Sequence, residues 1–299
     1  MPSRQPFTLL CQQLARKPGA GRADLHLHTT CSDGNYTPAE VIDLARRCGL
    51  SALAITDHDT LAGVEPARDA AGGAVEVVSG VEITTEFRGR ELHLLGYFVD
   101  IHDHALNDAL AGIRRDRVER FHAMVERLRG LGVSVTIEAA GSAPESLGRR
   151  YLAELLVRQG KAGSVREVFQ RWLGDRGRAA VPKWRLPVAE AIRLVRAAGG
   201  VAAWAHPFYD GAEPALGELA ALGLGAVEVE YPDLRLTLRQ QLRAWARQLG
   251  LAVTGGSDCH GPGRRTVGAC TISDEELERL RQLRGNSCSV PCTTSSSKG

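Results

Sequence analysis

The chain has 299 residues, of which 43% are hydrophobic and 24% charged, so it can bury a substantial core and does not belong to the disordered or collagen-like classes. Its 37 lysines and arginines against 35 aspartates and glutamates leave a formal charge of +2, which gives no overall reason to bind nucleic acid or an anionic membrane. No apolar stretch approaches the roughly 20 residues of a membrane-spanning helix, and residues 1–21 lack the apolar segment of a secretory signal, so we expect a cytoplasmic protein.

The cysteines support this expectation, and the two ends of the chain differ in composition from the rest. The seven cysteines are odd in number and form no Cys-x-x-Cys pair, which favours free thiols in a reducing compartment. Residues 1–21 form an N-terminal extension. Residues 286–299 are rich in Ser and Thr and are predicted to be a disordered tail.

The first predicted unit is a strand followed by a helix and a second strand. Ala23–His28 has the composition of a strand, and Thr37–Glu40 (TPAE) supplies an N-cap threonine, a proline at the first helical position and a glutamate that completes a capping box. The helix is predicted to run to about Cys48, because Gly49 follows. Ser51–Thr56 is an apolar run with little alternation, as in a parallel sheet covered on both faces.

Strands and helices continue to alternate along the chain, which predicts an α/β fold with a barrel-like or strongly curved sheet. The further predicted strands are Val75–Ser79, Leu92–Val99, Val201–Ala205, Ala226–Val229 and Leu251–Thr254. The clearest later helices are Val188–Ala198 and Leu234–Leu249. Residues 103–182 are rich in Arg, Glu and Leu at helical spacing and are predicted to be a helical insertion, so that residues 22–102 and 183–285 form the barrel.

Histidines and acids cluster where the predicted strands end. His26 and His28 are two residues apart on one strand, so their side chains point to the same face, and Asp33 follows in the next turn. Later strands end with the same residue types, at Asp57, His58, Asp59, Glu82, His93, His206, Asp258 and His260. Because a ligand site in such folds lies beyond the carboxyl ends of the strands, we expect these side chains to converge.

Each histidine taken alone has an ordinary explanation. A single His-x-His pair is more often a surface or cross-strand pair, and His93 or His206 alone would more often be a core histidine with satisfied hydrogen bonds. Six histidines and three acids at five strand ends would, however, leave many buried polar groups without a purpose. Together they predict a metal centre, whereas His102, His104 and His122 lie outside this pattern.

In these segments the sequence resembles the polymerase and histidinol phosphatase (PHP) superfamily of metal-dependent phosphoesterases. The matching segments, in chain order, are HLHTTCSDG, ITDHDT, GVEI, HLLGY, AHP and GSDCHG. They span roughly residues 22–283, nearly the whole chain. The resemblance implies a distorted (β/α)7 barrel with a helical insertion after the His93 segment.

The resemblance also implies a trinuclear metal site, because all nine ligand positions carry a ligand. It places one ion on His26, His28, Glu82 and Asp258, a second on Glu82, His93 and His206, and a third on Asp33, His58 and His260. Two or three divalent ions are expected, with Mn preferred and Zn or Fe as alternatives, since the donors are nitrogen and carboxylate oxygen without thiolate. Three carboxylates against three divalent ions leave a positive surplus that suits phosphate.

The expected reaction is in-line attack on phosphorus by a metal-bridging hydroxide. His206 or His260 is expected to assist the leaving group, and the sequence does not rank them. Asp57 is expected to orient an imidazole rather than bind a metal, and Asp59 to be a helix N-cap. Cys259 is expected to point away from the site, since its neighbours on both sides in sequence carry ligands.

Four residues are candidates for binding substrate. Arg149, in GRRYLA, resembles the Gly-Arg segment of the PHP branch that acts on nucleoside 3′,5′-bisphosphates and small RNA 5′ ends, although the residues after it depart from that branch's Pro-His. Lys183 falls where that branch carries a basic residue, and Arg264 or Arg265 follows the last metal motif. Tyr231 is expected either to stack on a base or to pack in the core.

The leading hypothesis is therefore removal of the 3′-phosphate from nucleoside 3′,5′-bisphosphates, with trimming of short 5′-phosphorylated RNA. Histidinol-phosphate and cyclic-phosphate phosphoesterases are the nearby alternatives, and a non-catalytic metal-binding module is the alternative of another class. The expected partners are a small phosphorylated nucleotide or an RNA 5′ end, with no membrane and no double-stranded DNA.

Overall fold

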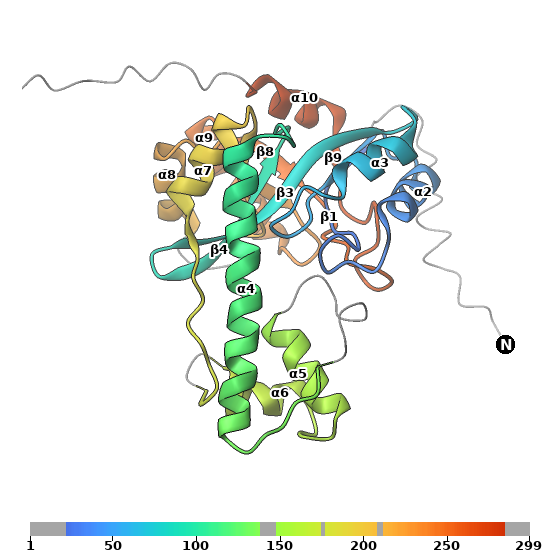
Figure 1. Ribbon diagram of the computed structural model, residues 1–299. Helices are drawn as coiled ribbons and strands as arrows, with labels where there is room; N and C mark the ends of the chain where they lie inside the picture. Colours follow the sequence, from blue (N-terminus) through green and yellow to red (C-terminus); the bar gives the residue numbers. More distant parts are fainter. Residues whose placement is uncertain (1–21, 138–147, 175–176, 208–211, 285–299) are drawn as a thin grey trace, which may run out of the picture.

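The computed structural model describes residues 22–137, 148–174, 177–207 and 212–284 as a curved, nearly closed sheet with helices outside it and a helical lobe to one side (Figure 1). The strands are β1 (Arg22–Leu27), β2 (Ala52–Ile55), β3 (Glu76–Phe87), β4 (Arg90–Tyr97), β5 (Leu186–Pro187), β6 (Val201–Trp204), β7 (Ala226–Glu230), β8 (Ala252–Gly255) and β9 (Ile272–Ser273). The helices are α2 (Pro38–Cys48), α3 (Val64–Ala71), α4 (His104–Gly130), α5 (Arg149–Arg158), α6 (Val165–Val168) with the π-helical turn η1 (Phe169–Leu173), α7 (Val188–Ala197), α8 (Ala212–Ala221), α9 (Leu236–Leu249) and α10 (Asp274–Gln282). The predicted extension 1–21 and tail 286–299 lie outside the described residues. None of the helices in the described ranges combines the length and the apolarity that crossing a bilayer demands.

The sheet has the strand order β8-β7-β6-β4-β3-β2-β1-β9, with β5 beside β3. The segment after β8 returns to β1 and nearly closes the ring: the backbone N–H of Asp258 donates to the carbonyl of His26 (2.8 Å), and that of His28 donates to the carbonyl of Cys259 (3.0 Å). The expected distorted barrel is therefore confirmed. The carboxyl ends of strands far apart in sequence meet at one edge of this ring.

The first strand-helix unit forms as its sequence predicts. The hydroxyl of Thr37 accepts a hydrogen bond from the N–H of Glu40 (3.3 Å), and the carboxylate of Glu40 accepts one from the N–H of Thr37 (2.8 Å). Gly49 ends α2 with a φ of 68°, a conformation that suits glycine. The loop between β1 and α2 is thus held between two fixed elements.

The hairpin between β3 and β4 differs from the expected pattern of parallel strands. β3 continues well past Ser79 and pairs antiparallel with β4, through a turn at Arg88 and Gly89 with φ values of 54° and 75°. Two residues of positive φ make the turn that matches the twist of a hairpin. Because β4 runs backwards, His93 in its first half reaches the same edge as the carboxyl ends of the parallel strands.

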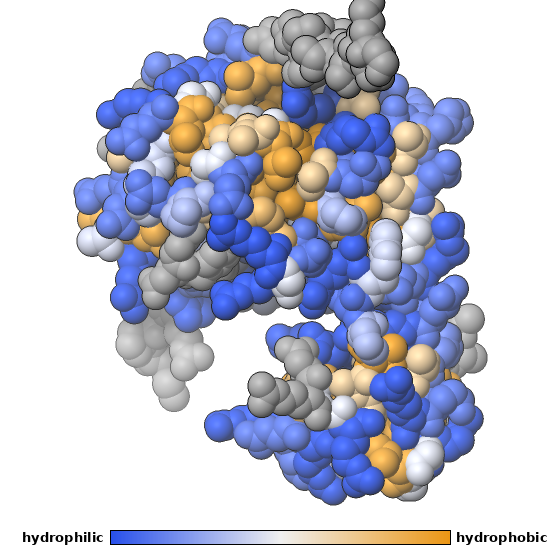
Figure 2. Space-filling view, turned by 90° about the vertical axis from the view of Figure 1, so that its left-hand side faces the viewer, coloured by the Kyte–Doolittle hydropathy of each residue, from blue (hydrophilic) through white to orange (hydrophobic). Residues whose placement is uncertain are grey.

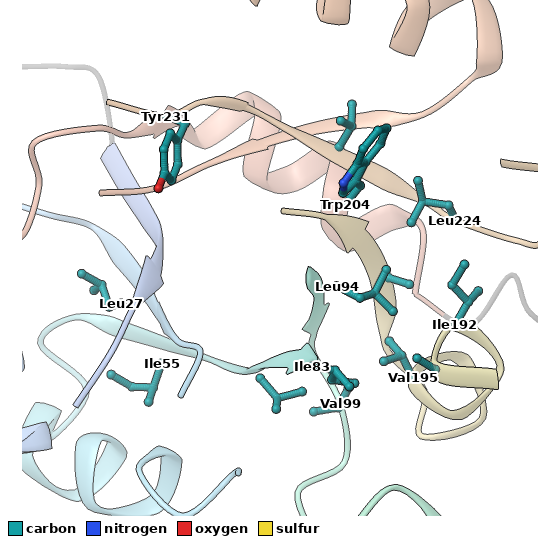
Figure 3. Close-up of a cluster of buried hydrophobic side chains, with 14 of the residues drawn as sticks. Leu27, Ile55, Ile83, Leu94, Val99, Ile192, Val195, Trp204, Leu224 and Tyr231 are labelled. Carbon is teal, nitrogen blue, oxygen red and sulfur yellow. The ribbon is translucent and has the colours of Figure 1, made fainter. Parts of the chain in front are cut away.

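The main core packs the sheet against the outer helices. Buried Leu27, Ile55, Ile83 and Leu94 come from four strands and belong to one cluster with residues of α2, α3, α7, α8 and α9 (Figure 3). Burying each such side chain contributes on the order of 1.5–3 kcal/mol. The strands are therefore held firmly below the edge where the polar residues gather.

The helices within residues 103–182 form a lobe with its own core. α4 contributes Leu106 and Ile113 to the barrel core, whereas Phe121 and Leu128, further along the same helix, pack with α5 and η1 around Trp172. At 27 residues, α4 is about 40 Å long and connects the two cores. Figure 2 shows an indentation between barrel and lobe, bordered largely by hydrophilic residues.

Candidate metal centre

All nine predicted ligand residues gather at one edge of the sheet. They come from β1 and the loop after it (His26, His28, Asp33), the segment after β2 (His58), β3 (Glu82), β4 (His93), the segment after β6 (His206) and the segment after β8 (Asp258, His260). Their convergence follows from the strand order, because the parallel strands carry these residues toward their carboxyl ends and the antiparallel β4 carries His93 in its first half.

The carboxylate of Glu82, only 1% exposed, lies at the centre of this cluster. Five imidazoles surround it, three near Oε2 and two near Oε1: His26 Nε2 (3.2 Å), His28 Nε2 (3.1 Å) and His58 Nδ1 (3.2 Å) at the former, His93 Nδ1 (2.8 Å) and His206 Nε2 (3.0 Å) at the latter. A carboxylate with nitrogen donors on both oxygens can bridge two cations.

Three sets of residues could each hold an ion, because the donor atoms within each set all lie within 4.8 Å of one another. They are His26, His28, Glu82 and Asp258; His58, Glu82 and His93; and His28, Asp33, His58 and His260. The first set is the one that the family resemblance implies, and the third adds His28 to the implied set. In the second, His58 joins Glu82 and His93, while His206 Nε2 lies 3.0 Å from Glu82 Oε1, the oxygen that His93 also contacts.

The buried ring nitrogens fit a metal better than they fit hydrogen bonding. Both nitrogens of His28 and Nδ1 of His58 are buried and form no hydrogen bond within the described residues, although carboxylate oxygens lie about them. Buried polar atoms without a partner are costly, and cations would satisfy them. The mixed nitrogen and oxygen donors suit Mn, Fe or Zn.

Burial and neighbouring charges shift the pKa values of these groups in different directions. Burial opposes charge on His28, but the nearby carboxylates of Asp258 and Glu82 raise its pKa to about 10. Burial likewise opposes charge on His93, yet Glu82 raises its pKa to about 9. Burial lowers the pKa of His58 to about 3. Desolvation would raise the pKa of Asp258, but neighbouring His26 and His28 hold it well below its usual range.

A buried carboxylate that the sequence analysis missed orients two of the histidines. Glu228, on β7 and 0% exposed, accepts hydrogen bonds from Nδ1 of His26 (2.9 Å) and from the backbone N–H of His206 (2.7 Å). It therefore directs His26 Nε2 at the centre and holds His206 at a φ of 34°, in the left-handed region. The signal that could have found it is an acid inside an otherwise apolar predicted strand.

Tyr231 and Arg265 hold the far oxygen of Asp258. The hydroxyl of Tyr231 donates to Asp258 Oδ2 (2.7 Å), and the guanidinium of Arg265 pairs with the same oxygen while lying over the Tyr231 ring. Oδ1 of Asp258 remains directed at His28, 3.2 Å away. Tyr231 is 2% exposed, which favours the expected alternative of packing in the core over stacking on a base.

Two further aspartates have other partners than expected. The carboxylate of Asp57 accepts hydrogen bonds from Thr29 N–H (2.6 Å) and from the hydroxyls of Thr29 and Ser32 (both 2.7 Å), so it fixes the loop that carries Asp33 instead of orienting an imidazole. The carboxylate of Asp59 does not cap α3. It is fully buried, accepts from the N–H of Thr84 (2.8 Å) and pairs with Arg117, and thus joins α4 to β3.

Cys259 points away from the cluster, as expected. Its thiol is buried and directed at the carbonyl of Gly261 (3.6 Å), and burial raises its pKa. The protonated thiol of a buried cysteine is a poor ligand.

A cavity of about 330 Å³ brings the predicted residues Arg149 and Lys183 together. Its lining also includes Arg120 and Arg185, two cations that the sequence analysis missed because α4 and the segment before β5 meet only in the fold. The Lys183 ammonium lies 2.8 Å from Glu91 Oε2, and Glu91 Oε1 lies 3.3 Å from His93 Nε2. The cavity is thus joined to the cluster through one carboxylate.

The predicted residue Arg264 lies elsewhere, on an exposed loop after β8. It lines a larger cavity of about 740 Å³, together with Arg239 and Arg265. Of the four substrate-binding candidates, Arg149 and Lys183 therefore share one cavity, Arg264 lines another, and Tyr231 is buried.

Several known proteins are similar to this chain. The PHP domain matches residues 24–159. The chain is 34% identical over 249 residues to the 5′-3′ exoribonuclease Rnm of Escherichia coli, covering 80% of this chain and 85% of that one, and 32% identical to the 3′,5′-nucleoside bisphosphate phosphatase of Chromobacterium violaceum, covering 82% and 90%. A crystal structure from Bifidobacterium adolescentis, assigned as a metal-dependent phosphoesterase, superposes with a TM-score of 0.76 at 28% identity over 90% of this chain and 98% of that one.

Proposed function

Because this chain belongs to the PHP family and is a metal-dependent phosphoesterase, we propose that it removes the 3′-phosphate of nucleoside 3′,5′-bisphosphates and trims short 5′-phosphorylated RNA. The observation that carries this proposal is the basic cavity of Arg120, Arg149, Lys183 and Arg185 beside the cluster of nine ligand-type residues. A substrate with two phosphates would place one at the metal centre and the other in this cavity.

In this proposal the nine residues around Glu82 hold two or three divalent ions, Mn in preference to Zn or Fe. Ions bound there would stabilise charge on the phosphoryl oxygens and lower the pKa of bound water. Glu228, Tyr231 and Arg265 keep the donor atoms aimed at the ions, because each of them holds a ligand by its other side.

The basic cavity is built to receive an anion. Burial lowers the pKa of Arg120, and the neighbouring charge of Arg149 lowers it further, so an anion between the two guanidiniums would relieve their repulsion. Glu91 forms ion pairs with Lys183 and Arg185 and offsets part of this effect on Arg120. Guanidinium groups bind phosphate in a bidentate manner, and a hydrogen bond to a charged group contributes about 1.5–3 kcal/mol.

Hydrolysis would add water to phosphorus and break the bond between phosphorus and O3′ of the upstream nucleotide. The departing O3′ needs a proton, and whichever of His206 and His260 does not hold an ion is the candidate to donate it. Both lie at the rim of the cluster and are partly exposed, at 20% and 36% of their side chains, whereas His26 and His28 are fully buried.

Release of phosphate from adenosine 3′,5′-bisphosphate and from adenosine 3′-phosphate, with Mn present, tests the proposal. The wild type should prefer the bisphosphate, and Arg149→Ala or Lys183→Ala should reduce this preference roughly 10- to 100-fold while turnover of the 3′-phosphate stays similar. Arg193→Ala, which removes an exposed arginine outside both cavities, is the matched control. Turnover of histidinol phosphate or of a cyclic phosphate, with none of the bisphosphate, would reject the proposed substrate.

A further inference from the structure

The 740 Å³ cavity lies on the other side of the metal centre from the basic cavity. The basic cavity meets the centre through Glu91 and His93 on β4, and the larger cavity meets it through Arg265 and Asp258 after β8. In the ring β1-β2-β3-β4-β6-β7-β8, strands β4 and β8 are three places apart, the greatest separation that seven strands allow. The contacts that link the two cavities, from Glu91 and His93 to Asp258 and Arg265, therefore run through the metal centre.

Arginine dominates the charge of this larger cavity. Its lining contains three guanidinium groups and one carboxylate, with Pro232, Ala269 and Cys270 as the less polar part. Arg265 bridges Asp258 and Asp233, and Arg239 is held by Glu230 (2.9 Å). Arg264 is exposed and forms no ion pair within the described part of the chain, so its guanidinium is available to an incoming anion.

A nucleoside bisphosphate has no part that needs this cavity. Its 3′-phosphate ends at the metal centre, so nothing continues beyond it. In RNA the same phosphate continues through O5′ to the next nucleotide, whose sugar, base and 3′-phosphate must lie past the centre. A cavity of 740 Å³ is within the range of small-molecule sites, 300–1,000 Å³, and has room for such a unit.

We propose that the cavity of Arg239, Arg264 and Arg265 binds the nucleotide downstream of the scissile phosphate in single-stranded RNA, with Arg264 contacting the next phosphate. This inference rests on the proposed function, because it takes the 5′-phosphate to lie in the basic cavity. The cavity then decides whether the same centre accepts only bisphosphates or also RNA.

The reaction balances as a simple hydrolysis. Water adds to phosphorus, the bond between phosphorus and O3′ breaks, and O3′ gains a proton. The upstream nucleotide leaves with its 5′-phosphate and a free 3′-hydroxyl, and the downstream chain keeps the scissile phosphate as a new 5′-phosphate. The shortened RNA therefore begins with the group that the basic cavity binds, so the cycle can repeat.

The test compares two substrates of one enzyme: a 5′-phosphorylated RNA trinucleotide and adenosine 3′,5′-bisphosphate, with Mn present. Arg264→Ala should lower kcat/KM for the trinucleotide about tenfold and leave kcat/KM for the bisphosphate within about twofold. It should also reduce the salt dependence of kcat/KM for RNA by about the 0.7 that one phosphate contact contributes to the logarithmic slope. Ala269→Trp, which fills the cavity without removing charge, should impair only the RNA reaction, and Arg193→Ala should impair neither.

The outcomes separate this inference from the function on which it rests. If the wild type cleaves neither substrate, the proposed function fails. If it cleaves the bisphosphate but not the trinucleotide, the phosphatase function stands and the downstream site is overturned. If it cleaves both, and Arg264→Ala and Ala269→Trp leave the RNA reaction unchanged or lower both reactions in parallel, the downstream site is overturned as well.

Discussion

Replacing Glu228 by glutamine tests whether a residue outside the ligand set tunes the metal centre. The two side chains have nearly the same shape, so packing is preserved. The carboxylate now accepts two hydrogen bonds, from the imidazole of His26 (2.9 Å) and from the backbone N–H of His206 (2.7 Å). An amide has only one oxygen, and its NH₂ group would face the second donor.

The size of the effect follows from the burial of Glu228, which is 0% exposed. One N–H would lose its acceptor away from water, which costs about 1–3 kcal/mol, or about 5- to 150-fold in an equilibrium constant. If His26 loses the contact, its ring no longer has a fixed tautomer. If His206 loses it, the left-handed backbone at that residue loses its support. Both changes weaken the hold on metal.

Metal affinity is measured by competition of Mn with a chelator, alongside the melting temperature of the metal-free protein. Glu228→Gln should bind metal 5- to 150-fold more weakly. Glu76→Gln, the same substitution at an exposed position paired with Arg281, should bind it as the wild type does. Unchanged affinity in a folded Glu228→Gln protein would refute the argument that this carboxylate orients the ligands.

Three further outcomes are expected. Without metal, the melting temperature should fall as pH rises from about 6.5 to 10, because the pKa of His28 is raised to about 10 in the fold and its contribution is lost as the proton leaves; a flat or rising profile in chelator would contradict this. Arg117→Ala should lower the free energy of unfolding by about 3–5 kcal/mol in denaturant titrations, since it leaves the buried charge of Asp59 without its ion-pair partner, and a loss near zero would refute that role. Gly256→Ala should disrupt metal binding because its Cβ would lie 2.4 Å from the β1 backbone, whereas Gly217→Ala in α8, with open space around it, should be neutral or stabilising by thermal melts; equal effects would contradict this.

Local sequence features predicted the elements that depend on local physics. The capping box at Thr37 and Glu40 defined the start of α2, and the ligand residues could be recognised because strand ends place them at one edge of a sheet. The parallel class of the fold thus carried most of the candidate site. The sequence did not predict which residue each of these side chains contacts.

The missed features depend on contacts between segments distant in sequence. Asp59 has the local setting of an N-cap, but Arg117 arrives beside it from α4, 58 residues later. Tyr231 is buried because Asp258 and Arg265 converge on it. Arg120 joins Lys183 only because the lobe packs back toward the barrel. Neither the periodicity nor the spacing of residues in the sequence predicts such contacts.

Because the long helix α4 spans both cores, the lobe can change without a change in the metal centre. Its first half belongs to the barrel core and its second half to the lobe core, and Arg120 lies at the junction. Insertions or deletions further along the lobe would alter the wall facing the indentation without moving any residue of the cluster around Glu82. Changes in the lobe would therefore alter the size of substrate that fits the indentation. Relatives of this chain could differ in substrate while sharing the same metal centre.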